Sequence, residues 1–400
     1  MIFELAANLI GLASGFVLAS KQLLLRQVNH SSKKYGRVAK IIANQSTELE
    51  ANPASKFKIS VIVPLFNDLG YLPTLMTSLS AQSRPTDEII IVGECAVHPS
   101  NVLHNGDNFR YIMTSSKSIE VSRQDKLHDD CLAGAIASTG DLLIFLPSEV
   151  RLERDAIELM FQEATRRSSV DRSIHFQAIS VQPYCEVINF HDYASLFTML
   201  ASSFGKGLCH KKTSYLTDTL SPVVFVARDV FLASSSHETA EKVAVDKHDS
   251  ILPLAKVSDT ESPTFTSYLG GQHIRFRPGN GRFRSLMQFL VEDTAPGILR
   301  IPPRFLVLVA LWLLACTSIV IELIQASFQT DAWPVLIYLA LYLLTLVQLN
   351  LASRHVGRFS KSAIFFYPLW LATFWVIFII SFFRNYVFSK SKSNQEETTL

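Results

Sequence analysis

The sequence predicts an α/β domain with a mostly parallel sheet, joined to one N-terminal and about three C-terminal transmembrane helices. Two observations predict this class. Between residues 56 and 300, short runs of apolar and β-branched residues alternate with amphipathic segments, which is the pattern of a parallel sheet covered by helices on both faces. Outside this region, four apolar runs lack charged side chains, and three of them are long enough to cross a bilayer.

The composition excludes several classes of protein. The chain has 37 Lys and Arg residues against 35 Asp and Glu residues, so it lacks the basic footprint of a nucleic-acid binder. Its five cysteines are odd in number and form no Cys-x-x-Cys pair, so neither a disulfide framework nor a zinc site is predicted. The central region is long enough for one large domain or two tightly joined halves.

The first 25 residues predict a membrane anchor. An apolar run over residues 5–20 comes first, and basic residues follow it, beginning with Lys21 and Arg26. A secretory signal has the reverse order, with its basic residues before the apolar run. We therefore expect an uncleaved anchor over residues 1–25 with its positive end in the cytoplasm, followed by a polar linker over residues 26–55. The alternative is an interfacial helix that does not cross, because the run is short for a full span.

The C-terminal quarter predicts three further helices, over residues 303–326, 332–353 and 363–384, and a polar tail over residues 385–400. Basic residues lie before the first helix and between the second and third, so the positive-inside rule places these segments inside: Arg300, Arg304, Arg354, Arg358 and Lys361. A full crossing by the third helix would send the basic residues of the tail outside, against the same rule: Arg384, Lys390 and Lys392. The third helix therefore either crosses the membrane completely or enters the membrane and returns to the same side.

The α/β region predicts a regular alternation of strands and helices. Strands are expected over residues 58–64, 88–92, 110–113, 141–146 and 178–182, and helices over residues 71–81, 126–138 and 153–166. Ligands of such sheets bind beyond the carboxyl ends of the strands. The residues that carry function are therefore expected just after each strand.

Three segments carry a resemblance to a known family. They are Val61-Ile-Val-Pro-Leu-Phe-Asn-Asp68, Asp87-Glu-Ile-Ile-Ile-Val92, and Gly134-Ala-Ile-Ala-Ser-Thr-Gly-Asp141 with the strand that follows it. Together they resemble family 2 glycosyltransferases of the GT-A fold, from about Lys58 to Arg284. The single N-terminal anchor and several C-terminal spans are similar to the carotenoid and hopanoid-associated members. The resemblance implies transfer of one sugar, with inversion, from a nucleotide-diphosphate sugar to a lipid-soluble or membrane-presented acceptor.

The resemblance also implies a nucleotide-sugar site, formed by Pro64, Asn67, Glu94, Lys126 and Ser148. Pro64 and Asn67 would lie against the nucleotide, and Glu94 stands near the position of the family's acidic, base-reading residue. Lys126 falls where the family has a lysine that faces the phosphates, whose charge a cation would neutralise. The alternative interpretation is that Glu94 and Lys126 are solvated surface residues.

The metal motif of the family departs from its usual form here. The chain has Pro147-Ser148-Glu149 where the family has Asp-x-Asp, so the first carboxylate is missing. Glu149 stands at the position of the last acid, and the resemblance implies that it is a ligand of a divalent metal, Mn or Mg. An enzyme that works without a metal is the alternative.

The segment Val245-Asp-Lys-His-Asp249 resembles the family's acceptor site. The resemblance implies Asp249 as the general base, a role that suits a carboxylate because it need only accept a proton from the attacking hydroxyl. Asp246 is the competing candidate. A capping residue at the start of a helix is the alternative role for Asp249.

The arginines and aromatic residues over 273–284 lead into an amphipathic juxtamembrane segment over residues 281–292. They suit a diphosphate or lipid headgroups, or simply form a basic face. The Gln-x-x-Arg-Trp motif of polymer synthases is absent, which favours single-sugar transfer. The catalytic domain, residues 56–300, is expected on the cytoplasmic face of the cell (inner) membrane. The rival function is a non-catalytic relative that binds nucleotide, lipid or a protein partner, and the missing acids at Gly93 and Pro147 favour it.

Overall fold

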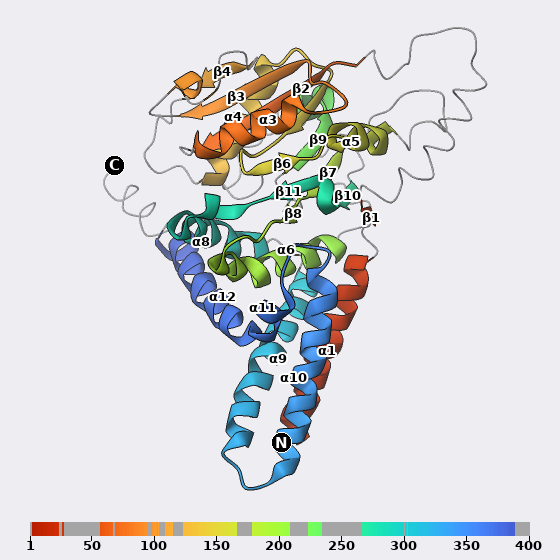
Figure 1. The fold of residues 1–400 in the computed structure, drawn as a ribbon, viewed down its shortest axis with the longest axis vertical. Coiled ribbons are helices and arrows are strands. Elements are labelled where there is room, and N and C mark those ends of the chain that lie inside the picture. Colours follow the sequence, from red (N-terminus) through yellow and green to blue (C-terminus); the bar gives the residue numbers. More distant parts are fainter. Residues whose placement is uncertain are drawn as a thin grey trace, which may run out of the picture. The chain divides into compact units, whose positions relative to one another are not determined.

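The computed structural model divides into two compact units (Figure 1). The membrane unit is formed by three segments, Met1–Leu25, Cys185–Cys209 and Arg277–Leu400. The α/β unit is formed by Arg26–Tyr184 and His210–Phe276. The structure describes residues 2–23, 26–27, 57–66, 69–94, 98–101, 103, 109–114, 123–165, 178–208, 223–233, 266–299, 301 and 303–388.

The α/β unit contains an eight-stranded sheet with the order β1-β10-β7-β9-β5-β2-β3-β4. Its strands are β1 (Arg26–Gln27), β2 (Ile59–Phe66), β3 (Glu88–Glu94), β4 (Arg110–Met113), β5 (Leu142–Phe145), β7 (Ile179–Gln182), β9 (Val223–Ala227) and β10 (Thr266–Leu269). Neighbouring strands run parallel except at β9, which is antiparallel to both β5 and β7. The predicted mostly parallel sheet is therefore confirmed.

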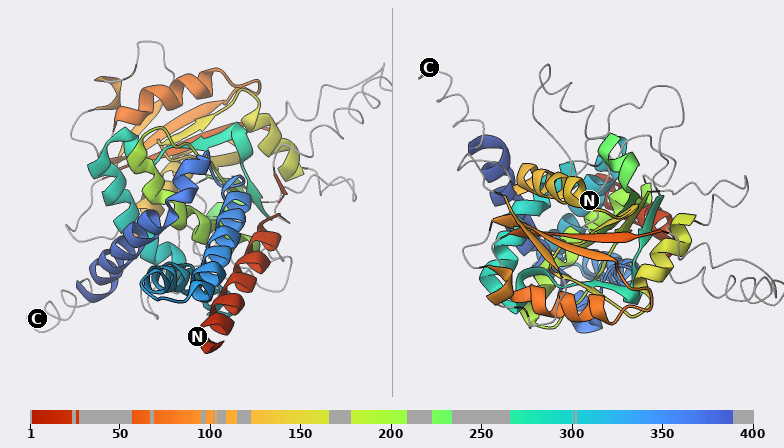
Figure 2. Two further views of the ribbon diagram at one scale, coloured as in Figure 1. Left: turned by 60° about the horizontal axis from the view of Figure 1, so that its bottom comes forward. Right: turned by 90° about the horizontal axis from the view of Figure 1, so that it is seen from above.

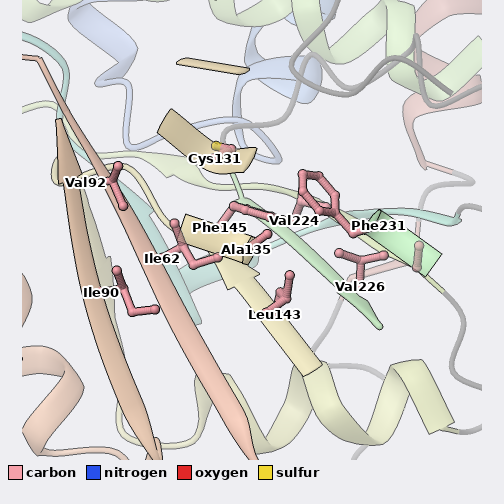
Figure 3. Close-up of a cluster of buried hydrophobic side chains, with 11 residues drawn as sticks. Ile62, Ile90, Val92, Cys131, Ala135, Leu143, Phe145, Val224, Val226 and Phe231 are labelled. Carbon is pink, nitrogen blue, oxygen red and sulfur yellow. The ribbon is translucent and has the colours of Figure 1, made fainter. Parts of the chain in front are cut away.

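The centre of the sheet is buried on both faces. The apolar residues of β2 from Ile59 to Leu65 are at most 1% exposed, as expected for a parallel strand covered on both sides. One face packs against α4 (Arg123–Ala137), where Cys131 and Ala135 join the buried cluster drawn in Figure 3. Gly134 allows this close contact, since a Cβ atom at that position would lie 2.5 Å from Ile62 Cγ2.

Further helical elements of this unit are η2 (Leu69–Tyr71), α3 (Leu72–Ser80), η3 (Pro99–Asn101), α5 (Ala156–Thr165) and η6 (Gly271–His273). The buried face of α3 is the predicted one, with Leu72, Leu75, Met76 and Leu79. Two short strands, β6 (Val150–Leu152) and β11 (Ile274–Phe276), pair antiparallel. The chain passes from the α/β unit to the membrane unit within the strand β8 (Tyr184–Cys185).

Four helices of the membrane unit are long and apolar enough to cross a membrane, by length and composition. The qualifying segments are Phe3–Ser20, Phe305–Ser327, Ala332–Ser353 and Tyr367–Asn385. They belong to α1 (Ile2–Leu23), α9 (Pro303–Ser327), α10 (Ala332–Ser353) and α12 (Tyr367–Phe382) with its π-helical extension η8 (Phe383–Phe388). This agrees with the predicted number, one N-terminal and three C-terminal.

The helices α1, α9 and α10 form a closely packed bundle (Figure 2). Gly11 lets α1 approach α9, because a Cβ atom there would lie 2.3 Å from Ala315 Cβ. Gln348 of α10 joins all three helices: its Oε1 accepts a hydrogen bond from Trp312 Nε1 at 2.8 Å, and its Nε2 donates to Leu12 O at 3.0 Å. Satisfied polar groups of this kind fix the register of helices in an apolar surrounding.

The remaining elements of the membrane unit are η4 (Phe190–Ser195), α6 (Leu196–Leu208), η7 (Pro278–Gly281), α8 (Phe283–Leu299) and α11 (Lys361–Phe365). The predicted amphipathic segment is the first part of α8. Its apolar face packs against η4 and α12 in a cluster formed by Ala194, Leu286, Leu290 and Ile377. The capping box of η4 is formed by Asn189 and Asp192.

Candidate functional site

The carboxyl ends of the parallel strands meet at one edge of the sheet. Phe66, the last residue of β2, is in register with Glu94, the last residue of β3. Pro64 lies in β2 opposite Val92 and is buried. The polar residues that follow β3, β4 and β5 are the candidates for a ligand site, because ligands of open α/β sheets bind at this edge.

Glu94 and Lys126, predicted from separate motifs, form an ion pair. The Lys126 Nζ atom lies 3.2 Å from Glu94 Oε2, and it reaches the end of β3 from near the start of α4. The side chains are 20% and 51% exposed for Lys126 and Glu94, respectively. An ion pair of this exposure contributes little to stability, so the lysine is available to a more strongly charged partner.

Gly93 has a backbone conformation that suits a glycine. Its φ is +149°, a backbone conformation that L side chains rarely adopt, and a Cβ atom there would lie 2.5 Å from Leu65 O. The carbonyl of Gly93 is held by the Tyr111 hydroxyl, which donates to it at 2.8 Å, and by Thr114 N at 3.4 Å. An acidic side chain at position 93 would therefore strain the end of β3, and the glycine fixes the direction in which Glu94 leaves the strand.

Asp130 is a buried acid beside this pair, and the sequence analysis did not identify it. It lies on α4 one turn after Lys126 and is 1% exposed. Its Oδ1 accepts a hydrogen bond from Thr114 Oγ1 at 2.6 Å, while its Oδ2 has no hydrogen-bond partner within the part of the chain that the structure describes. Burial raises the pKa of Asp130, against the hydrogen bond from Thr114 and the positive charge of Lys126, which lower it. The i to i+4 spacing from Lys126 was the signal available in the sequence.

The turn after β5 holds Ser148 and Glu149. Ser148 is buried, and its Oγ donates to Glu149 Oε2 at 3.2 Å. Arg151 Nη1 donates to Ser148 O at 2.7 Å, and its guanidinium lies 5.5 Å from the centre of the Tyr71 ring. These contacts fix the turn and orient the Glu149 carboxylate.

A divalent metal fits this turn only in part. One carboxylate, oriented by a serine, supplies a single hard oxygen ligand, and diphosphate oxygens of a bound donor would have to supply others. Among the described residues, no group of three or more His, Cys, Asp or Glu side chains is placed to hold a metal ion. The metal role of Glu149 stays a prediction.

Three candidate site residues lie outside the described residues: Asn67, Asp246 and Asp249. The roles of Asn67 and Asp249 therefore stay predictions. Of the other predicted site residues, the structure brings together Glu94 with Lys126 and Ser148 with Glu149.

Comparison with curated proteins shows what the chain is similar to. It is 23% identical over 276 residues to the 4,4'-diaponeurosporenoate glycosyltransferase of Staphylococcus haemolyticus, which covers 65% of this chain and 67% of that protein. It is 22% identical over 326 residues to the protein of the same name from Staphylococcus aureus strain USA300, which covers 81% of this chain and 83% of that protein. The chain is a glycosyltransferase homologue. The predicted resemblance to carotenoid-associated glycosyltransferases is thereby confirmed.

Solved glycosyltransferases are similar at a lower level. A mannosyltransferase from Pyrobaculum calidifontis in complex with GDP-Man and Mn2+ is 10% identical with a TM-score of 0.40, covering 95% of this chain and 99% of that one. Glucosyl-3-phosphoglycerate synthase from Mycobacterium tuberculosis is 13% identical with a TM-score of 0.34, covering 62% of this chain and 81% of that one. No family model matches this homologue.

Proposed function

We propose that this protein is a membrane-bound glycosyltransferase that moves one sugar from a nucleotide-diphosphate sugar to a lipid-soluble or membrane-presented acceptor. One observation carries the proposal. The match to the Staphylococcus aureus glycosyltransferase covers 81% of this chain, which is more than either unit contains, so the likeness includes both the α/β unit and membrane helices. The strand-end site and the apolar helices supply the two parts that such a transfer needs.

The donor would bind at the carboxyl ends of β2, β3 and β5. When the donor binds, the Lys126 ammonium would leave Glu94 and bind the diphosphate, whose charge exceeds that of a single carboxylate. Glu94 would then be free to accept hydrogen bonds from the nucleoside. Asp130 is a positioning residue in this account, because its buried carboxyl lies one turn from Lys126 and holds Thr114 at the end of β4. Pro64, Asn67 and Ser148 complete the proposed donor site.

A divalent ion, Mn or Mg, would be held by Glu149 together with diphosphate oxygens. When bound, such an ion neutralises the negative charge that develops on the leaving diphosphate. Ser148 keeps the Glu149 carboxylate oriented through the hydrogen bond to Oε2. Ser148→Ala is therefore expected to weaken the metal dependence of donor binding, and to leave the fold intact.

The transfer step follows from the proposed base, Asp249. With a hydroxyl acceptor, the acceptor oxygen attacks the anomeric carbon, its proton passes to the Asp249 carboxylate, and the bond from that carbon to the diphosphate breaks. A single displacement of this kind inverts the configuration of the sugar. The Staphylococcus relatives are named for diaponeurosporenoate, which is a carboxylate by its name, and a carboxylate acceptor needs orientation rather than proton removal. Retention of configuration would contradict Asp249 as a simple base.

The proposed site faces the cytoplasm. The basic residues between α10 and α12 include Arg354, Arg358 and Lys361, whereas the connection at residues 328–331 between α9 and α10 contains no Lys or Arg. The positive-inside rule places the first segment in the cytoplasm and the second outside. Nucleotide sugars are made in the cytoplasm, so this face of the cell membrane suits their use.

The test is sugar transfer by the purified full-length protein. Labelled nucleotide sugars are incubated with a lipid extract, and incorporation of label into lipid is followed for the wild type, Asp249→Asn and Asp246→Asn. We expect transfer by the wild type, a loss of about 10²–10⁴-fold in Asp249→Asn, and near-normal transfer in Asp246→Asn. Binding without transfer in the wild type would favour the non-catalytic function, and unchanged transfer in Asp249→Asn would exclude that residue as the base.

A further inference from the structure

The helix α12 starts beside the middle of the membrane bundle. The ring of Tyr367, its first residue, stacks on Tyr342 with ring centres 5.1 Å apart, and Tyr342 is midway along α10, which is Ala332–Ser353. The Tyr342 hydroxyl donates to Phe365 O at 2.5 Å. Further along α12, Trp375 Nε1 donates to Thr317 Oγ1 at 3.0 Å, near the middle of α9. At 1.5 Å per residue, Tyr342 lies about 16 Å from the end of α10, so the chain returns about half-way into the bundle before α12 begins.

The carboxyl end of α12 lies against α8. Ser381 Oγ accepts a hydrogen bond from Ala295 N at 3.0 Å, and Asn385 Nδ2 donates to Val291 O at 3.4 Å. Arg384 pairs with Glu292 at 3.5 Å. Because α8 ends at Leu299, shortly before α9 begins at Pro303, these contacts place the end of α12 at the end of the bundle where α9 starts.

The two ends of the bundle are defined by the connections of its helices. The near end holds the start of α9 and the end of α10, and the far end holds the short connection at residues 328–331. Gln22, at the end of α1, belongs to the near end, because its Nε2 donates to Ala352 O at 3.3 Å and to Ser203 Oγ of α6 at 2.8 Å. A crossing α12 would finish at the far end, and the contacts of its last residues are instead with α8.

We propose that α11 and α12 form a re-entrant hairpin, which enters one leaflet of the bilayer from the near end and returns to it. The partner of its outer face is the acyl-chain layer of that leaflet. This face carries exposed apolar side chains, with Leu369 52% exposed, Val376 57% and Ile379 51%. The length of α12 with its extension would also allow a crossing, so the proposal rests on its contacts: the second half of the helix packs against α8 through Ile377, which joins Leu286 and Leu290 in one buried cluster.

The charge distribution supports the same topology. Arg358 and Lys361 follow α10 at the near end, and Arg384 ends α12 beside Glu292. With a re-entrant hairpin, Arg384 and the lysines of the tail share the near end with these residues, and every basic connection obeys the positive-inside rule. With a crossing helix, Arg384 would face the opposite side.

The test uses single cysteines in a full-length protein from which the native cysteines have been removed. Gln329→Cys marks the far end, Arg354→Cys marks the near end, Ser391→Cys marks the tail and Val376→Cys marks the outer face of α12. Sealed vesicles are treated with a membrane-impermeant maleimide from each side. The hairpin predicts that Ser391→Cys is labelled from the same side as Arg354→Cys and opposite to Gln329→Cys, and that Val376→Cys is labelled from neither side.

Two results would overturn the proposal. Labelling of Ser391→Cys from the side of Gln329→Cys would mean that α12 crosses, and labelling of Val376→Cys from the near side would mean that it does not enter the bilayer. Because removal of the buried Cys131, Cys185 and Cys316 can unfold the protein, the wild-type chain is also fused at its C-terminus to green fluorescent protein or alkaline phosphatase. Fluorescence without phosphatase activity supports the hairpin, and phosphatase activity contradicts it.

Discussion

Replacement of Lys126 by glutamine tests whether this lysine binds the donor diphosphate. In the structure the Lys126 ammonium lies 3.2 Å from the Glu94 carboxylate, and the two side chains are 20% and 51% exposed. Lys126→Gln removes the charge and keeps a side chain of similar length. The variant is therefore expected to bind the nucleotide sugar more weakly without unfolding.

The size of the effect follows from the balance of two contacts. An exposed ion pair such as Glu94 with Lys126 is worth at most about 1 kcal/mol, and donor binding gives this up. A charge-assisted hydrogen bond from the lysine to a phosphate contributes about 1.5–3 kcal/mol. The difference is about 0.5–3 kcal/mol, so Lys126→Gln is expected to raise the donor Kd by about 2- to 150-fold.

The assay is a titration of donor into purified full-length protein, with Lys58→Gln as the matched control. Lys58 is exposed and precedes β2, at the opposite end of the strand from the site. The control is expected to bind the donor like the wild type and to show the same thermal midpoint. Equal donor affinity in Lys126→Gln and Lys58→Gln would refute the assignment of Lys126 to the diphosphate.

Three further substitutions test the structure around the site and in the bundle. In Gly93→Ala, the added Cβ atom would lie 2.5 Å from Leu65 O, on a residue whose φ is +149°. This substitution is expected to lower the free energy of unfolding by about 1–3 kcal/mol, measured by chemical denaturation. Burial raises the pKa of Asp130, so its contribution to stability is complete below the unfolded-state pKa and falls as pH rises through the folded-state pKa. The thermal midpoint of Asp130→Asn is therefore expected to rise relative to wild type from pH 4 to pH 7, and a constant difference would contradict this. In Gly15→Leu, the added Cβ atom would lie 2.2 Å from Trp312 Cδ1. This substitution is expected to destabilise the helix bundle by about 1–3 kcal/mol or more, which would lower the thermal midpoint of the protein in detergent.

Much of the sheet was predictable because its central strands are buried on both faces. The strands β2, β3 and β5 read as continuous apolar runs, and their parallel pairing follows from the helices between them. The insertion of β9 between β5 and β7 was not predictable in the same way. It is antiparallel to both neighbours and follows them in the sequence, so its place depends on tertiary packing.

The candidate site was predictable only where the family resemblance pointed to a residue. The resemblance implied Glu94 and Lys126, and the structure pairs them. Asp130 was missed because a single acid in a polar helical segment usually faces solvent, and only the packing of α4 on the sheet buries it. The conformation of Gly93 was also beyond the sequence, since a glycine gives no sign of which φ it adopts.

The measurement that tests the central claim most directly is calorimetric binding of UDP-sugars and GDP-sugars to the detergent-purified wild-type protein, with Mn2+ and then with a chelator. We expect micromolar binding of one donor class, weakened when the chelator removes the metal held at Glu149. Binding that is unaffected by the chelator would remove the metal from the account and leave the donor site in place. Absence of binding to every nucleotide sugar tested would contradict the glycosyltransferase function.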